Sequence, residues 1–132
     1  MGAIAYLLDT HTLLWWWSSP ERLSPRVLSL VRQPDHDVYV SVGSAWEIAT
    51  KHRIGKLPSG AAILHDWDRR VHEDRFLPLP ISAGHARKAG GLIHDHRDPF
   101  DRVLAAQSML GGLPVLSKDA RLSALGAERI WD

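Results

Sequence analysis

The chain has 132 residues, of which 45% are hydrophobic and 23% charged, values that are ordinary for one globular domain with its own core. Its formal net charge of +1 excludes a strongly basic overall field, so a nucleic-acid site would have to be a local patch. The absence of cysteine excludes disulfides, iron–sulfur clusters, cysteine-bound zinc and thiol nucleophiles, and it fits a reducing compartment.

The N-terminal residues do not show the pattern typical of a signal for export or membrane insertion. They lack a basic segment followed by a long apolar run, and no stretch of the chain approaches the length needed to span a membrane. We therefore expect residues 1–132 to form a single domain of a cytoplasmic protein that does not associate with membranes.

Short apolar runs alternate with amphipathic stretches along the chain. The run Ile4–Leu8 ends at Asp9, which is typical of a buried strand with an acid at its C-terminal end. Further strands are expected at residues 38–41, 76–79, 113–116 and 128–131, and helices at residues 12–17, 25–31, 44–54, 63–71, 82–91, 99–111 and 122–125. This alternation predicts a three-layer α/β/α fold whose central, mostly parallel sheet is flanked by helices.

Two of the expected helices have acidic residues in or next to their first turn. The segment Ser44–Glu47 fits the S-x-x-E capping box and predicts that a helix begins at Ser44. Pro99 suits the first position of a helix, because its missing N–H would be unpaired there. Asp98 is then the N-cap and Asp101 the third helical residue, so both acids have an ordinary explanation as capping groups.

Four acids, Asp9, Glu47, Asp101 and Asp119, are expected to share one place in the fold, which capping does not explain. In an open parallel sheet the carboxyl ends of the strands lie at the same edge, and ligands bind there. Asp9 follows the first strand, Glu47 the second and Asp119 the third. Asp101 would approach this edge from its helix.

Such a group of carboxylates predicts a metal site. Three or four carboxylates at close range cannot all stay ionised without a cation. Oxygen ligands without cysteine favour Mg²⁺ or Mn²⁺ over zinc. A site of this kind suits phosphodiester hydrolysis, in which the metal activates water and stabilises developing charge. Glu47 would be either the general base or a further ligand.

Several basic residues are candidates for phosphate contacts. Exposed ion pairs, worth less than about 1 kcal/mol, are the ordinary alternative for such residues. A basic cluster at the end of the helix that carries Glu47 has a further alternative, because cations are favoured at helix C-termini. The candidates for RNA contacts are Arg97, Arg102, Lys118 and Lys51.

Four segments together resemble the PIN-domain ribonucleases, and most of all the VapC-type toxins of bacterial toxin–antitoxin pairs. The motifs occur in order and at similar spacing over nearly the whole chain. The segments are Leu-Leu-Asp9-Thr-His-Thr-Leu-Leu-Trp, Ser41-x-x-Ser-x-Trp-Glu47-Ile, Asp98-Pro-Phe-Asp101-Arg and Ser117-Lys-Asp119.

This resemblance implies a Mg²⁺- or Mn²⁺-dependent endoribonuclease that is often a homodimer and is inhibited by a VapB-like antitoxin. It also assigns roles by position. The residues that match the acidic site are Asp9, Glu47, Asp101 and Asp119, and those in supporting positions are Asp98, Ser117 and Thr10.

Three other interpretations remain open. A receiver-like phosphoacceptor module would share the α/β sheet and a late Ser-Lys pair, but it normally has paired acids where this chain has Asp9 alone. A zinc hydrolase could use the run His94-x-His96-x-Asp98, although Pro99 interrupts its usual continuation. A PIN fold that binds RNA without cutting it would not need all four acids.

The triplet Trp15-Trp16-Trp17 is unusual. Successive helical residues point about 100° apart, so the three side chains sweep about 200° of the helix surface. The stripe that a helix buries on a sheet is only somewhat wider than about 100°. At least one indole is therefore expected outside the main core, where it is covered by the helix that begins at Pro25 or serves as an anchor for the antitoxin.

Overall fold

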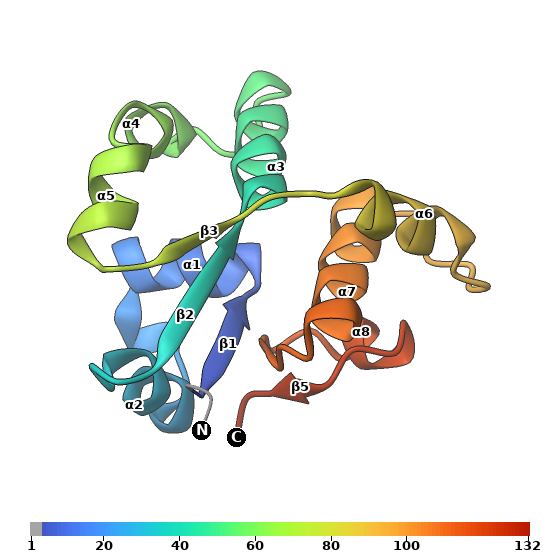
Figure 1. Cartoon of the computed structure of the whole chain (residues 1–132). Coiled ribbons are helices and arrows are strands. Elements are labelled where there is room, and N and C mark those ends of the chain that lie inside the picture. Colours follow the sequence, from blue (N-terminus) through green and yellow to red (C-terminus); the bar gives the residue numbers. More distant parts are fainter. Residues whose placement is uncertain (1–3) are drawn as a thin grey trace.

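A computed structural model describes residues 4–132 (Figure 1). Its centre is a five-stranded sheet in which every pairing is parallel, with the order β3-β2-β1-β4-β5. The strand expected at residues 76–79 lies at one edge of the sheet, a position that suits Pro78 because it cannot donate a hydrogen bond to a neighbour. The strands are β1 (Ala5–Leu8), β2 (Asp37–Ser41), β3 (Leu77–Leu79), β4 (Val115–Leu116) and β5 (Arg129–Ile130).

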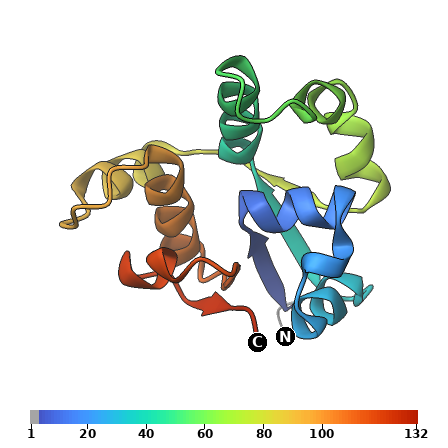
Figure 2. The ribbon, with the colours of Figure 1, turned by 180° about the vertical axis from the view of Figure 1, so that it is seen from behind.

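Helices connect the strands, and none of those in residues 4–132 is long and apolar enough to cross a membrane. Seen from behind, α1 crosses in front of β2 (Figure 2), whereas α6 and α7 pack against each other (Figure 1). The helices are α1 (Thr10–Ser18), the 3₁₀ helix η1 (Pro20–Arg22), α2 (Pro25–Arg32), α3 (Val42–Arg53), α4 (Gly60–His65), α5 (Trp67–Glu73), α6 (Ala83–Gly91), α7 (Pro99–Gly111) and α8 (Ala120–Ala124).

The alternation of side chains along β1 builds two cores, one on each face of the sheet. Successive strand residues point to opposite faces. Tyr6 and Leu8 join a cluster with residues of α1 and α2, including Leu13, whereas Leu7 joins a cluster with residues of α7 and α8, including Leu104. The predicted three-layer α/β/α architecture is therefore confirmed.

The register of the three inner strands brings their carboxyl ends together. Leu8 pairs with Val40 of β2 and with Leu116 of β4. The next residues along the chain therefore leave the sheet at the same edge. These residues are Asp9, Ser41 and Ser117.

The start of α3 differs from the prediction. The helix begins at Val42, directly after the end of β2. Its N-cap is Ser41, whose hydroxyl accepts a hydrogen bond from the Gly43 N–H at 3.0 Å. Ser44 lies inside the helix, and its hydroxyl is hydrogen-bonded to that of Thr10 at 2.8 Å. The capping box predicted for Ser44 is therefore wrong, and Glu47 lies in the second turn of α3.

The single helix expected at residues 63–71 is also wrong. Asp66 divides this segment into α4 and α5, and its backbone lies outside the ideal helical region with φ −97° and ψ 10°. The helix that begins at Pro99 is confirmed. Its last residue is Gly111, and Gly112 follows with a left-handed backbone (φ 63°) that glycine adopts without a steric penalty.

Candidate functional site

Asp9 is a buried carboxylate that does not cap a helix. It occupies the N-cap position of α1, but its side chain makes no capping hydrogen bond. Instead, the Ser117 hydroxyl donates a hydrogen bond of 2.7 Å to Asp9 Oδ2 and accepts one of 2.9 Å from the Asp119 N–H. Only 5% of Asp9 is exposed. Ser117, itself fully buried, thus links the acids that follow β1 and β4.

Burial raises the pKa of Asp9 to about 6, because the carboxylate loses its hydration. The hydrogen bond from Ser117 and the charge of His11 lower this pKa, whereas the negative charges of Asp101 and Glu47 raise it further. Two other acids of the candidate site are therefore close enough to Asp9 for their charges to raise its pKa.

Asp101 lies in the first turn of α7 and is also buried. Burial is the largest cause that raises its pKa, and the negative charges of Asp98, Glu47 and Asp119 act in the same direction. A hydrogen bond from His96 opposes this rise. The four predicted acids are thus coupled by charge, with Asp101 linked to each of the others.

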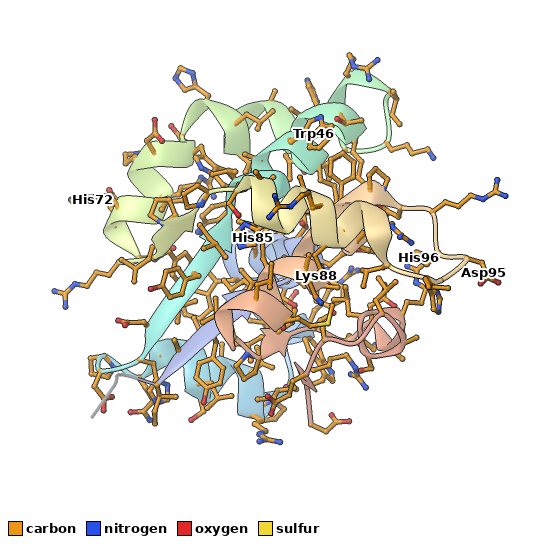
Figure 3. The ribbon with its side chains drawn as sticks, turned by 45° about the vertical axis from the view of Figure 1, so that its right-hand side comes forward. Trp46, His72, His85, Lys88, Asp95 and His96 are labelled. Carbon is orange, nitrogen blue, oxygen red and sulfur yellow. The ribbon has the colours of Figure 1, made fainter. Side chains whose placement is uncertain are left out.

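His96 was not assigned to the acidic site by the sequence. It lies in the loop between α6 and α7, beside Asp95 (Figure 3), and its Nε2 is 2.8 Å from Asp101 Oδ2. Asp101 therefore does not act as a capping group at the start of α7, as its sequence position had suggested. Asp98 does act as the predicted N-cap, since its Oδ1 accepts a hydrogen bond of 2.9 Å from the Phe100 N–H.

The remaining two acids each form an ion pair with a basic side chain. Glu47, which is buried, forms an ion pair with Lys51 one turn later in α3. Asp119 is the N-cap of α8, and its carboxylate accepts hydrogen bonds from the Arg121 N–H and guanidinium. The Arg121 guanidinium holds the pKa of Asp119 below its ordinary value. Arg121 is a further site residue that the sequence analysis missed.

The donor set fits a divalent cation. Within residues 4–132, neither Asp9 nor Asp101 has an ion pair with a lysine or arginine, and the pKa of both is raised. The described residues whose ligand atoms all lie within 4.8 Å of one another are His96, Asp98 and Asp101. Asp9, Glu47 and Asp119 lie outside this tighter group. They interact with Asp101 through their negative charges.

The zinc alternative is not supported by the arrangement of the two histidines. His94 Nδ1 accepts a hydrogen bond of 3.0 Å from the His96 backbone N–H. His94 therefore does not join His96 and Asp98 in the group that could hold a cation among residues 4–132. The ligand run His94-x-His96-x-Asp98 is not assembled as a unit.

Among the residues predicted to contact phosphate, Arg102 forms hydrogen bonds within the protein. Its guanidinium donates hydrogen bonds to the backbone carbonyls of Ala89, Leu92, His94 and His96. Arg102 thus fixes the loop that carries His96, and its contact with RNA stays a prediction. Lys51 is paired with Glu47, while Arg97 and Lys118 are exposed.

The role of Asp98 can be tested by comparing two substitutions. Asp98→Ala should lower the free energy of unfolding by about 1 kcal/mol, because the N-cap of α7 is lost, and it should reduce activity only modestly. Asp98→Asn should preserve both, since asparagine caps helices as well as aspartate does. Urea unfolding and RNA cleavage assays of the two variants provide the measurement. Complete inactivation by Asp98→Asn would identify Asp98 as a metal ligand instead.

Comparisons with known proteins identify a matching family and a relative. The model of the PIN domain family matches residues 6–128. Ribonuclease VapC22 of Mycobacterium tuberculosis is 27% identical over 117 residues, which cover 88% of each chain.

Two solved structures have a similar fold. A chain in the structure of VapBC2 from Rickettsia felis, bound to a promoter DNA fragment, has a TM-score of 0.66 at 12% identity, with 98% of this chain and 100% of that chain covered. A chain of VapBC-5 from Mycobacterium tuberculosis has a TM-score of 0.64 at 22% identity, with 97% and 98% covered. Since the family model spans nearly the whole chain, the chain belongs to the PIN domain family.

Proposed function

We propose that this protein is a metal-dependent endoribonuclease and the toxin of a toxin–antitoxin pair. The observation that carries the proposal is that Asp9 and Asp101 are buried carboxylates with no lysine or arginine partner within residues 4–132, an arrangement that fits the binding of a divalent cation. The similarity to a protein named Ribonuclease VapC22 supports RNA as the substrate.

In this proposal Asp9 and Asp101 hold the cation, and Asp119 and Glu47 complete the acidic site. Mg²⁺ or Mn²⁺ would act there as a Lewis acid toward the scissile phosphate and a nearby water. Ser117 orients Asp9 through its 2.7 Å hydrogen bond, and His96 orients Asp101 through its 2.8 Å contact. Such outer partners of metal ligands fix the ligand geometry.

Glu47 is the candidate general base for the attacking water. Its carboxylate is buried and forms an ion pair with Lys51 one turn later in α3. The buried hydrogen bond between Thr10 and Ser44 joins the start of α1 to α3 and so fixes Asp9 relative to the helix of Glu47. Thr10 is thus a positioning residue in this proposal. Arg97 and Lys118, which are exposed, remain candidates for phosphate contacts.

Removal of metal should stop the reaction. Cleavage of a single-stranded RNA by the purified protein should fall to background in EDTA and return when excess Mg²⁺ or Mn²⁺ is added, because the carboxylates alone cannot stabilise charge on the phosphate. Gel analysis of the RNA fragments provides the measurement. Cleavage that persists unchanged in EDTA would contradict the proposal, and restoration by Zn²⁺ alone would contradict the choice of metal.

The proposed partners are an antitoxin and a second copy of the chain. The similar structure VapBC-5 is described as a member of the VapBC family of toxin–antitoxin systems, and VapBC2 shares the name VapBC. We propose that a VapB-like antitoxin inhibits this protein in the cytoplasm and that the protein forms a homodimer.

A further inference from the structure

The fold explains two of the three consecutive tryptophans. The indole N–H groups of Trp16 and Trp17 both donate hydrogen bonds to Asp74, at 3.1 and 2.7 Å. Trp17 also packs edge-on against Trp67, with ring centroids 5.5 Å apart. These two side chains therefore attach α1 to the segment around α5 and serve the stability of the fold.

Trp15 faces a different part of the molecule. Its ring lies edge-on to Trp131, with centroids 6.0 Å apart, and the Arg22 guanidinium lies over it at 5.8 Å from the ring centroid. Trp15 is only partly buried. Trp131 and Arg22 thus hold this indole in place without enclosing it.

Trp15 lines a cavity that is shared with the acidic site. The cavity has a volume of about 270 Å³ and largely apolar walls. Two of its lining residues, Asp9 and Asp119, belong to the acidic site, and His11 and Lys118 complete the lining. His11 also lies near Trp15, with ring centroids 6.1 Å apart. An aromatic surface therefore adjoins two of the four acids of the proposed metal site.

We propose that this cavity binds one nucleobase of the RNA next to the phosphate that is cleaved, an inference that rests on the proposed function. Aromatic side chains bind the bases of single strands by stacking, whatever their sequence, and cationic groups beside them hold the backbone. Trp15 provides the ring and Lys118 the exposed cation. The cavity is smaller than the roughly 300–1,000 Å³ of drug-sized sites, which suits a single flat ring system.

A nucleobase fits the lining better than an apolar side chain of a protein partner does. His11 and Lys118 offer polar groups that the edge of a base can pair with, whereas an aliphatic side chain has no polar atom for either of them. The wall formed by Asp9 and Asp119 also places the occupant beside the proposed metal, where the phosphate of the same nucleotide must lie.

The test compares Trp15→Leu with Trp15→Phe in the cleavage-inactive Asp101→Asn background. Leucine keeps an apolar side chain but removes the ring, whereas phenylalanine keeps a ring. Binding is measured by fluorescence anisotropy with short oligouridylate and oligoadenylate, and with a sugar–phosphate strand of the same length that lacks bases. Trp17→Phe, on the same helix but outside the cavity, controls for a general disturbance of α1.

Trp15→Leu should weaken binding of the base-containing strands by about five- to a hundredfold, the range of stacking on one aromatic side chain, and leave binding of the base-free strand unchanged. Trp15→Phe should retain most of the affinity, and Trp17→Phe all of it. Equal losses on both kinds of strand, or no loss on either, would overturn the proposal.

Two further outcomes separate the inference from the function on which it rests. If the wild-type protein does not cleave RNA with Mg²⁺ or Mn²⁺, the proposed function fails. If the wild-type protein cleaves RNA but Trp15→Leu binds RNA normally, only the nucleobase subsite is wrong. Normal RNA binding together with weaker binding of the antitoxin would instead identify Trp15 as an anchor for the protein partner.

Discussion

Asp101→Asn is expected to lower the rate of RNA cleavage by more than about a hundredfold while the protein remains folded. Changes to the outer partners of metal ligands already cost about 10- to 100-fold, so loss of a ligand charge should cost at least as much. Asparagine keeps the shape of the side chain, and its carbonyl can still accept the hydrogen bond from His96. The measurements are single-turnover cleavage with excess enzyme and thermal unfolding.

The matched control for this experiment is Asp95→Asn. Asp95 lies in the same loop as His96 but is exposed and points away from the sheet (Figure 3). The same change of chemistry there should leave cleavage and metal affinity as in the wild type. Calorimetric titration with Mn²⁺ should show weaker binding only for Asp101→Asn. Undiminished cleavage by a folded Asp101→Asn protein would remove Asp101 from the proposed site.

The sheet, and the edge of it at which the acids lie, could be predicted from the sequence because both depend on short-range patterns. Apolar runs of four or five residues, each followed by a polar residue, indicate buried parallel strands. The carboxyl ends of such strands must lie at one edge. The positions of Asp9 and Asp119 beside Ser117 follow from these two rules, and the hydrogen bonds of Ser117 confirm their proximity.

The start of α3 shows where a local pattern fails. Ser41 and Ser44 are both reasonable N-caps, and only Ser44 has a glutamate three residues later. The choice depends on β2, which continues to Ser41, and on Thr10, which hydrogen-bonds to Ser44 across 34 positions of the chain. Neither contact can be read from the residues around the helix start.

The partners of the acids were the least predictable part of the site. The Glu47–Lys51 pair has the ordinary i, i+4 spacing of a helix and could have been anticipated. The contact between His96 and Asp101 could not, since it depends on a loop whose shape is set by Arg102 and four backbone carbonyls. Such a loop has no periodicity from which its conformation can be inferred.

Asp9→Asn is expected to stabilise the protein in the absence of metal, although it should abolish RNA cleavage. Without divalent metal at about pH 7, Asp9→Asn should raise the free energy of unfolding by about 3 kcal/mol. The pKa of Asp9 rises from 3.8 to about 6 on folding, and each pKa unit corresponds to about 1.4 kcal/mol. Asparagine removes the buried charge and keeps a group that accepts a hydrogen bond from Ser117.

The sign of the pH dependence follows from this shift. Because the folded-state pKa is the higher one, protonated Asp9 favours the folded state, and this stabilisation is complete below about pH 4. It is lost as the pH rises to about 6, where the folded protein must carry the buried carboxylate. The stability difference between Asp9→Asn and the wild type should therefore be small near pH 4, grow between about pH 4 and 6, and stay constant above that.

Urea unfolding in EDTA across this pH range measures the difference, and Asp35→Asn, a change at an exposed turn, provides the control that should show no such trend. Excess Mg²⁺ or Mn²⁺ at about pH 7 should narrow or reverse the difference, because the metal stabilises only the protein that binds it. Asp9→Asn should also have lost cleavage under these conditions. A difference that does not vary with pH, or a wild type that is the more stable protein in EDTA at about pH 7, would show that the Asp9 carboxylate is not destabilised by burial. The metal would then not be needed to neutralise it.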